Sequence, residues 1–230
     1  MRRQELVVGA RFVMPSPDSR AVLPAVLSTA RLRLRRFEPS DAQRLAELLN
    51  DRDMSRYTAR VPFPYGMSDG EWFVGHVTEG EAAVDEGQAG EVVRAICLQQ
   101  AGAECGQLVG AVGLVLPAAA ASSRSATLGY WIGRDYWGRG IASEAVPAML
   151  SAAATSPALC WVDCFCAQVV APNVASCRVL LKIGFMQCAA FGDAGAGTAA
   201  VSKAELQSDA ADEEILGFEL SRKDALALVL

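Results

Sequence analysis

Apolar and polar residues alternate along several short stretches of the chain, which is the pattern of half-buried β-strands. Leu32 and Leu34, for example, alternate with Arg31, Arg33 and Arg35, so one face of that segment is apolar. Other stretches are continuously apolar and are bounded by glycine or proline, as in buried strands. Together these patterns predict strands at residues 28–37, 90–100, 107–116, 128–132, 159–170 and 215–220.

Helical segments separate these strands. Pro39-Ser40-Asp41 is a capping sequence, and leucines 45, 48 and 49 after it fall along one side of a helix. Residues 51–84 are a looser helical region with many aromatic residues, and residues 143–154 have a helical composition. A last helix is predicted from Pro172-Asn173 to Gly184, where the glycine serves as a left-handed cap. The mixture of strands and helices predicts an α/β fold with a substantial core.

The 230 residues are expected to form one domain, residues 27–230, after an irregular extension at residues 1–26. Residues 192–214 are rich in alanine, glycine and acidic side chains, and we interpret them as a flexible acidic insertion between the last two strands. The net charge of −5 argues against a nucleic-acid partner. Residues 105–123 lack charged side chains, but their glycines and proline favour a strand and a loop over a membrane span.

Seven cysteines raise the question of metal binding, but His76 is the only histidine and no Cys-x-x-Cys pair is present. Cys160, Cys164 and Cys166 share one face of the predicted 159–170 strand, where we expect small buried residues rather than ligands. No metal site is therefore predicted. The odd number of cysteines and the absence of a signal peptide favour a cytoplasmic location. The four arginines of residues 1–26 leave a mitochondrial presequence as the alternative.

The stretch from Leu128 to Ala145 has the strongest chemical character in the chain. A short apolar strand and a turn lead to Trp137-Gly138-Arg139-Gly140-Ile141-Ala142, which opens a helix. The first N–H groups of a helix lack internal partners, and glycines let an anion approach the backbone closely, so this loop suits a phosphate group. A Gly-x-Gly turn is equally consistent with a purely structural role. The dinucleotide fingerprint and the Gly-Lys-Ser/Thr phosphate loop are both missing.

This loop resembles the acyl-CoA loop of the GNAT superfamily of N-acetyltransferases, whose pattern is Gln/Arg-x-x-Gly-x-Gly/Ala. Trp137 in the first position is similar to the branch that acetylates the N-termini of ribosomal proteins. Residues 27–35, reading Leu-Ser-Thr-Ala-Arg-Leu-Arg-Leu-Arg, resemble the opening strand of the same branch. Residues 173–185 resemble its Asn-x-x-Ser-x-x-x-x-x-Lys-x-Gly-Phe signature. The resemblance implies a mixed, mostly antiparallel central sheet flanked by helices, with its fourth and fifth strands splayed apart.

The resemblance also implies acetyl-CoA as the co-substrate and an amine acceptor, either a protein N-terminus or a small amine. Pantetheine would pair with the strand at Tyr130, Trp131 and Ile132 and with Asn173, while the pyrophosphate would rest on residues 137–142, reading Trp137, Gly138, Arg139, Gly140, Ile141 and Ala142. Lys182 either reaches a phosphate or is simply solvated. The backbone N–H near Tyr130 or Trp131 is the expected oxyanion donor. Ser176 matches the position that protonates the departing thiolate, and a serine bonded to the helix backbone is the alternative.

The general base is not identified by the resemblance, because Thr127 stands where many relatives carry glutamate. The amine proton could pass through water to His76 or to an Asp or Glu carboxylate. Alternatively, the amine arrives already neutral. Glu144 is expected to cap or brace its helix. The predicted activity is acetylation of a primary amine by direct attack in a ternary complex. Because of Thr127, a non-catalytic acyl-CoA-binding module is the alternative.

Overall fold

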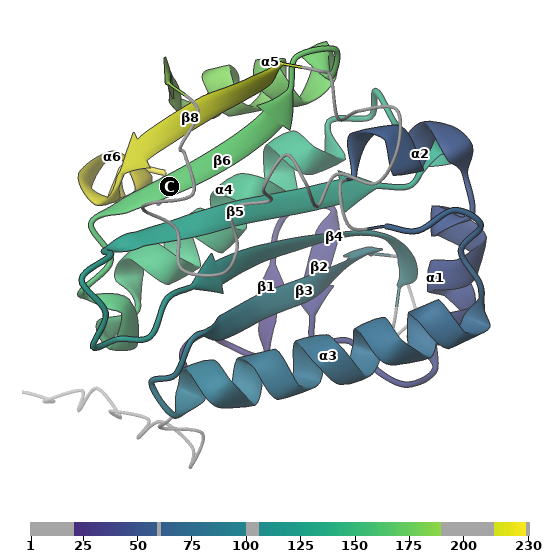
Figure 1. Cartoon of the computed structure of the whole chain (residues 1–230), viewed down its shortest axis with the longest axis horizontal. Helices are drawn as coiled ribbons and strands as arrows, with labels where there is room; N and C mark the ends of the chain where they lie inside the picture. Colours follow the sequence, from purple (N-terminus) through teal and green to yellow (C-terminus); the bar gives the residue numbers. More distant parts are fainter. Residues whose placement is uncertain (1–20, 59–60, 100–105, 190–213, 229–230) are drawn as a thin grey trace, which may run out of the picture.

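The computed structural model describes residues 21–58, 61–99, 106–189 and 214–228. Within them, one eight-stranded sheet has the order β1-β2-β3-β4-β5-β6-β8-β7 (Figure 1). Every neighbouring pair is antiparallel except β5 and β6, which are parallel. The strands are β1 (Val26–Ser28), β2 (Leu32–Arg35), β3 (Gly90–Leu98), β4 (Gln107–Leu116), β5 (Ser125–Ile132), β6 (Cys164–Val170), β7 (Met186–Cys188) and β8 (Ile215–Ser221).

Helices cover both faces of this sheet. The α-helices are α1 (Asp41–Leu49), α2 (Arg52–Tyr57), α3 (Met67–Asp85), α4 (Ile141–Thr155), α5 (Val174–Ile183) and α6 (Arg222–Leu226). Figure 1 shows α3 in front of the sheet beside β3 and α1, and α4 behind it. The apolar side of α4 includes Val146, Met149 and Leu150, which are all fully buried. The predicted mixed, mostly antiparallel α/β architecture is confirmed. None of the described helices is both long and apolar enough to cross a membrane.

The structure corrects several boundaries predicted from the sequence. The 28–37 segment is not one strand, because β1 and β2 pair with each other around a tight turn. The 159–170 strand begins only at Cys164, since Pro157 opens a 3-10 turn at Pro157–Leu159. Cys160 is consequently exposed and lies outside the strand, while Cys164 is half-buried and Cys166 is buried. The expected shared buried face of the three cysteines was therefore wrong.

The start of α1 also differs from the expected cap. The Ser40 side chain makes no capping hydrogen bond. Asp41 instead accepts a hydrogen bond from the backbone N–H of Glu38 and forms a buried ion pair with Arg35, with a nitrogen–oxygen distance of 2.7 Å. A carboxylate that is paired and hydrogen-bonded in this way tolerates burial. The helix is therefore anchored to β2 through its first residue.

The described end of the N-terminal segment packs into the domain. Val22 and Leu23 are buried, although they precede the first strand. The guanidinium of Arg94 in β3 is fully buried, and it donates hydrogen bonds to the Pro24 carbonyl and to the Glu81 carboxylate in α3. One buried cation thus joins the N-terminal segment, β3 and α3. Residues 1–20 and 190–213, which include most of the predicted extension and acidic insertion, lie outside the described residues.

The parallel pair β5–β6 separates soon after it starts. Its register covers only Ser125 to Thr127 on β5, opposite Cys164 to Cys166 on β6. Beyond these residues β6 continues to pair with β8, as far as Val170, while β5 continues to pair with β4. The sheet therefore opens between the two strands, as the resemblance implied. With the 28–37 segment divided, these strands are the fifth and sixth rather than the fourth and fifth.

Candidate active site

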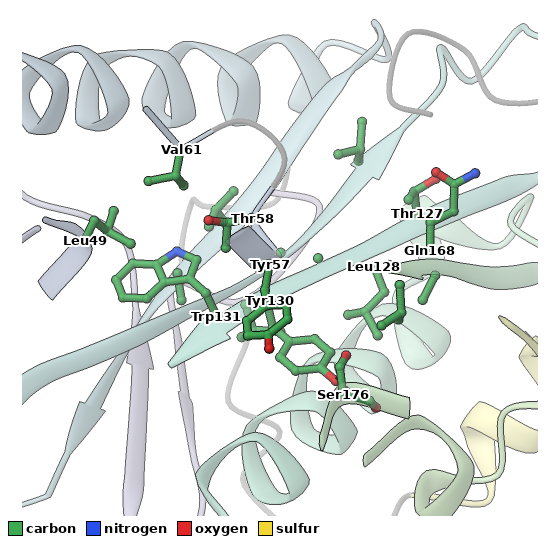
Figure 2. Close-up of a pocket in the computed structure, with 18 of the residues that line it drawn as sticks. Leu49, Tyr57, Thr58, Val61, Thr127, Leu128, Tyr130, Trp131, Gln168 and Ser176 are labelled. Carbon is green, nitrogen blue, oxygen red and sulfur yellow. Dashed lines mark hydrogen bonds between the residues drawn. The ribbon is translucent and has the colours of Figure 1, made fainter. Parts of the chain in front are cut away.

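A cavity of about 600 Å³ lies where β5 and β6 separate. Its wall is formed by residues of β6 and α5 on one side, β5 and β4 in the middle, and α2 and α3 on the other side. Figure 2 shows part of this lining. Its lining includes Trp72, His76, Glu91, Thr127, Gly129, Tyr130, Trp131, Gln168, Asn173 and Ser176. A Cβ built on Gly129 would meet no atom within 4 Å, so this glycine borders open space. Position 129 therefore adds no side chain to the cavity.

The pairing of β5 determines which backbone groups face the opening. Along a strand, the N–H and C=O groups of alternate residues point toward opposite neighbours. The N–H of Gly133 donates to the Val109 carbonyl at 2.8 Å, and Trp131 is the partner of Ala111, so odd-numbered residues pair with the β4 side. The backbone groups of Tyr130 therefore face the separated β6 side. Of the two expected oxyanion donors, geometry favours the N–H of Tyr130.

The side chain of Trp137 contacts the backbone at the C-terminal end of β5. Its indole nitrogen donates to the carbonyl of Ile132 at 2.6 Å, although the indole remains partly exposed. This carbonyl belongs to an even-numbered residue and so points toward the side that β6 has left. The bond supplies the partner that the strand no longer has there. Trp137 thereby fixes the loop after β5 to the end of the opening.

Tyr130 and Ser176 meet across the opening from different elements. Their hydroxyl oxygens are 2.8 Å apart, and Figure 2 shows the two side chains pointing toward each other. Burial raises the pKa of Tyr130 to about 12, and the hydrogen bond to Ser176 opposes this rise. Asn173 begins α5 by accepting a hydrogen bond from the Ser176 N–H through Oδ1, which leaves its amide NH₂ group as a donor beside the cavity. The hydroxyl groups of Tyr130 and Ser176 therefore both carry a proton at neutral pH.

The glycine loop after β5 presents unpaired backbone donors. Gly138 and Gly140 both adopt the left-handed region, with φ angles of 72° and 73°, and α4 begins at Ile141. Within the described part of the chain, the N–H groups of Gly138, Arg139 and Gly140 donate no hydrogen bond. These donors lie immediately before a helix N-terminus, where an anion is favoured. The Arg139 side chain folds back onto the Tyr136 ring, 5.3 Å from its centroid.

A second polar group stands on the opposite wall of the cavity. His76 Nε2 lies 2.6 Å from Glu91 Oε1, and the imidazole stacks on Trp72 with centroids 4.7 Å apart. Glu91 pairs with Val115 on β4, and Val115 pairs with Thr127 on β5, so the carboxylate and the threonine lie in one cross-strand row. Sequence reasoning missed Glu91. Its only local signal was a charged side chain at the start of an otherwise apolar strand.

The described geometry combines a strand opening, a donor-rich loop and a polar wall in one region. Residues 31–186, more than half of the chain, match the GNAT acetyltransferase domain family. The chain belongs to this family. The N-acetyltransferase p20 of Bacillus licheniformis, itself uncharacterized, is 28% identical over 161 residues, which are 70% of this chain and 82% of that protein.

Solved GNAT structures show the same fold. RimJ from Mycobacterium smegmatis, in complex with a CoA disulfide, is similar with a TM-score of 0.64 and 18% identity, over 86% of this chain and 87% of that one. Spermidine N-acetyltransferase from Vibrio cholerae, in complex with CoA and spermine, gives a TM-score of 0.58 and 16% identity, over 86% and 99% of the chains. This GNAT protein is therefore an acetyltransferase, as the sequence predicted.

The predicted site residues of this GNAT domain fall into two groups. Tyr130, Trp131, Asn173 and Ser176 line the cavity together. Residues 137–140 form the loop beyond the end of β5, Ile141 and Ala142 begin α4, and all six lie outside the cavity lining. Two predicted residues are in neither group. Ile132 is buried at the end of β5 and does not line the cavity. Lys182 is exposed in the last turn of α5, about 13 Å along the helix axis from Asn173. Among the described residues, no cluster of three or more histidine, cysteine or acidic side chains suits a metal ion.

Proposed function

We propose that the protein transfers the acetyl group of acetyl-CoA to a primary amine by direct attack within a ternary complex. The observation that carries this proposal is the opening between β5 and β6. It leaves the backbone of Tyr130 facing a cavity that reaches His76 and Glu91 at one side and Ser176 at the other. A thioester held along β5 would meet an amine that enters from the α3 side.

The residues of the opening fit the acyl donor. An extended pantetheine arm can pair with the unpaired edge of β5 as an added strand would. Gly129 leaves the space for it, and the NH₂ group of Asn173 is available as a donor. The diphosphate would rest on the N–H groups of Gly138 to Gly140, which lack partners in the described chain. Lys182 remains a candidate phosphate contact only for the outer part of the donor.

The chain supplies two elements of the acyl-transfer chemistry. The N–H of Tyr130 stabilises the oxyanion that forms when the amine attacks the thioester carbonyl, and such a donor is worth about 2.7–4 kcal/mol of barrier. Collapse of this intermediate forms the amide and breaks the carbon–sulfur bond. The Ser176 hydroxyl then gives its proton to the departing thiolate and is reprotonated by the Tyr130 hydroxyl, which lies 2.8 Å away. The Tyr130 phenol recovers its proton from solvent.

The amine must lose a proton in this reaction, and Thr127 cannot accept it at neutral pH. The His76–Glu91 pair lies on the acceptor wall, in the same cross-strand row as Thr127. Strands in a sheet are about 4.8 Å apart, so the Cα atoms of Glu91 and Thr127 are separated by roughly 10 Å. Water between them would carry the proton to the pair. The pair thus takes the place of the glutamate that many relatives carry at position 127.

A cationic amine suits the wall of this cavity. Asp69 and Glu91 line it with carboxylates, and the exposed Trp72 offers a ring face to an ammonium group. Arg56 lines another part and can accept a carboxylate or carbonyl of the acceptor. Similar GNAT structures include RimL, named as a ribosomal L7/L12 α-N-protein acetyltransferase, and the spermidine enzyme. We therefore propose either a protein N-terminus or a small amine as the acceptor.

Calorimetric titration of acetyl-CoA tests the donor site first. The Gly138→Glu/Gly140→Glu double variant should lose binding, because carboxylates would occupy the loop. Gly87→Glu is the control. Gly87 also has a positive φ (79°) and open space around it, but it lies after α3 and outside the glycine loop. No binding by the wild type would refute the proposal. Binding without turnover on a panel of N-terminal peptides and polyamines would instead support the non-catalytic acyl-CoA module.

A further inference from the structure

The turn between β1 and β2 is joined to the first turn of α4 by a dense polar contact. Glu144 Oε1 accepts hydrogen bonds from the Thr29 hydroxyl at 2.5 Å and from the Arg31 backbone N–H at 2.9 Å. Glu144 Oε2 accepts a hydrogen bond from Nε of Arg31 and forms an ion pair with Nη2, each at 2.7 Å. The two guanidinium nitrogens converge on one carboxylate oxygen, which restricts the orientation of the guanidinium. The brace expected for Glu144 therefore extends to a turn more than a hundred residues away in the sequence.

The same guanidinium contacts the glycine loop directly. Arg31 Nη1 donates to the backbone carbonyl of Arg139 at 3.0 Å. In a trans peptide, the C=O of one residue and the N–H of the next point in opposite directions. The bond to the Arg139 carbonyl therefore directs the N–H of Gly140 away from Arg31, and this N–H has no partner in the described chain.

The contact also changes the charge near the loop. Glu144 lies in the first turn of α4, where a carboxylate stabilises the helix but repels an anion bound at the same end. Arg31 neutralises this carboxylate, and its own side chain is 53% exposed. Nη2 of Arg31 lies 3.6 Å from the position that a Gly140 Cβ would take. The cation is therefore next to the loop and accessible to an anionic ligand.

We propose that Arg31 is a positioning residue for the diphosphate of the acyl donor, because it holds the Arg139–Gly140 peptide with its N–H directed toward the anion and neutralises Glu144. This inference rests on the proposed function. It assigns the β1–β2 turn, which contributes nothing to the cavity lining, to donor recognition. If Arg31 were only a structural brace, its loss would weaken the binding of all parts of the donor equally.

The experiment compares a ligand that carries the diphosphate and nucleotide with a ligand that lacks both. Dissociation constants for CoA and for acetyl-pantetheine, which lacks the diphosphate and nucleotide, are measured by calorimetry and by NMR titration. The variants are Arg31→Gln and Arg31→Lys. Arg124→Gln is the matched control, because Arg124 is also 53% exposed and ion-paired, with Asp163, and its loss removes the same net charge. Thermal melting of each variant confirms that it is folded.

Arg31→Gln should weaken CoA binding about tenfold and leave the affinity for acetyl-pantetheine unchanged within about twofold. The CoA affinity of Arg31→Lys should lie between those of the wild type and Arg31→Gln. Lysine keeps the charge but cannot contact the carboxylate and the carbonyl with one planar group. Arg124→Gln should match the wild type. An unchanged CoA affinity in Arg31→Gln, or equal losses for both ligands, would overturn the inference while the donor site stands. Failure of the wild type to bind CoA would refute the proposed function itself.

Discussion

The Tyr130 hydroxyl lies 2.8 Å from the Ser176 hydroxyl, although the two residues are 46 positions apart in the sequence. One comes from the edge of β5 that loses its neighbour, and the other from the first turn of α5. The contact therefore closes the opening on one side of the cavity. It also joins the proposed oxyanion donor and the proposed proton donor in a single unit.

We expect Ser176→Ala to lower kcat about a hundredfold, because the departing thiolate loses its proton donor. Tyr130→Phe should have a smaller effect in the same direction, since it removes only the group that reprotonates Ser176. Cys177→Ala, at the next position of α5 and outside the cavity lining, is the control. Steady-state kinetics with a saturating amine and a CoA dissociation constant for each variant separate chemistry from binding. Unchanged kcat in both hydroxyl variants would assign the proton to water.

The pH dependence of this pair follows from the pKa of Tyr130. Burial is the largest influence and raises the pKa of Tyr130 to about 12, while the Ser176 hydrogen bond opposes it. A phenol with this pKa stays protonated across the neutral and moderately alkaline range. The wild-type kcat should therefore show no loss attributable to Tyr130 below about pH 11. A loss at lower pH that disappears in Tyr130→Phe would contradict this assignment.

Gly129→Val should block the donor site without unfolding the domain. Its φ is not in the left-handed region, and a Cβ would meet no atom within 4 Å, so the backbone accepts a side chain that fills the opening. We expect acetyl-CoA binding to fall at least tenfold while the melting temperature is maintained. Gly75→Ala, on α3 with similarly open surroundings, should leave binding unchanged. Calorimetry and thermal denaturation of the two variants make the comparison.

Glu91→Gln tests the proposed acceptor wall. The change keeps the size of the side chain but removes the charge that pairs with His76. We expect kcat/KM for the amine to fall about tenfold or more, with CoA affinity unchanged, because the proton acceptor and a carboxylate of the cationic site are both weakened. Glu79→Gln, on α3 but outside the cavity lining, is the control. Equal amine kinetics in the two variants would exclude the pair from the reaction.

Glu81→Ala should destabilise the fold strongly, because it leaves the fully buried guanidinium of Arg94 without its carboxylate. Removing one partner of such a buried pair typically costs about 3–5 kcal/mol of unfolding free energy. The control is Glu47→Ala, which breaks an exposed helical ion pair with Arg44 and should cost at most about 1 kcal/mol. Urea denaturation of both variants measures the difference. Similar losses would show that the remaining bonds of Arg94 satisfy its charge.

Acid should release the contact between Arg31 and Glu144. Burial alone would raise the pKa of Glu144, but hydrogen bonds from Thr29 and Arg31 outweigh it and lower that pKa below its ordinary value. A carboxylate with a lowered folded-state pKa stabilises the fold above its unfolded-state pKa, and this contribution is lost as pH falls through the folded-state value. Melting temperature should therefore drop more for the wild type than for Glu144→Gln between about pH 6 and pH 3. Parallel curves would contradict this linkage.

The sequence by itself determined the features that depend on local backbone preference. Gly138 and Gly140 adopt the left-handed region in the predicted loop, Asn173 caps α5, and Gly184 ends that helix with a φ of 107°. The alternation of apolar residues placed most strands within a few residues of their observed bounds. These features could be predicted because each follows from neighbouring residues and from the conformations that glycine and asparagine allow.

The tertiary structure alone decided which distant residues meet. His76 and Glu91, Tyr130 and Ser176, and Arg31 and Glu144 are each joined across separate elements, and no local pattern encodes those pairings. Strand register places Glu91 in the row of Thr127, and the early end of the β5–β6 pairing creates the opening between them and α5. Register and separation result from packing of the whole sheet against its helices, so they emerge only when the chain is folded.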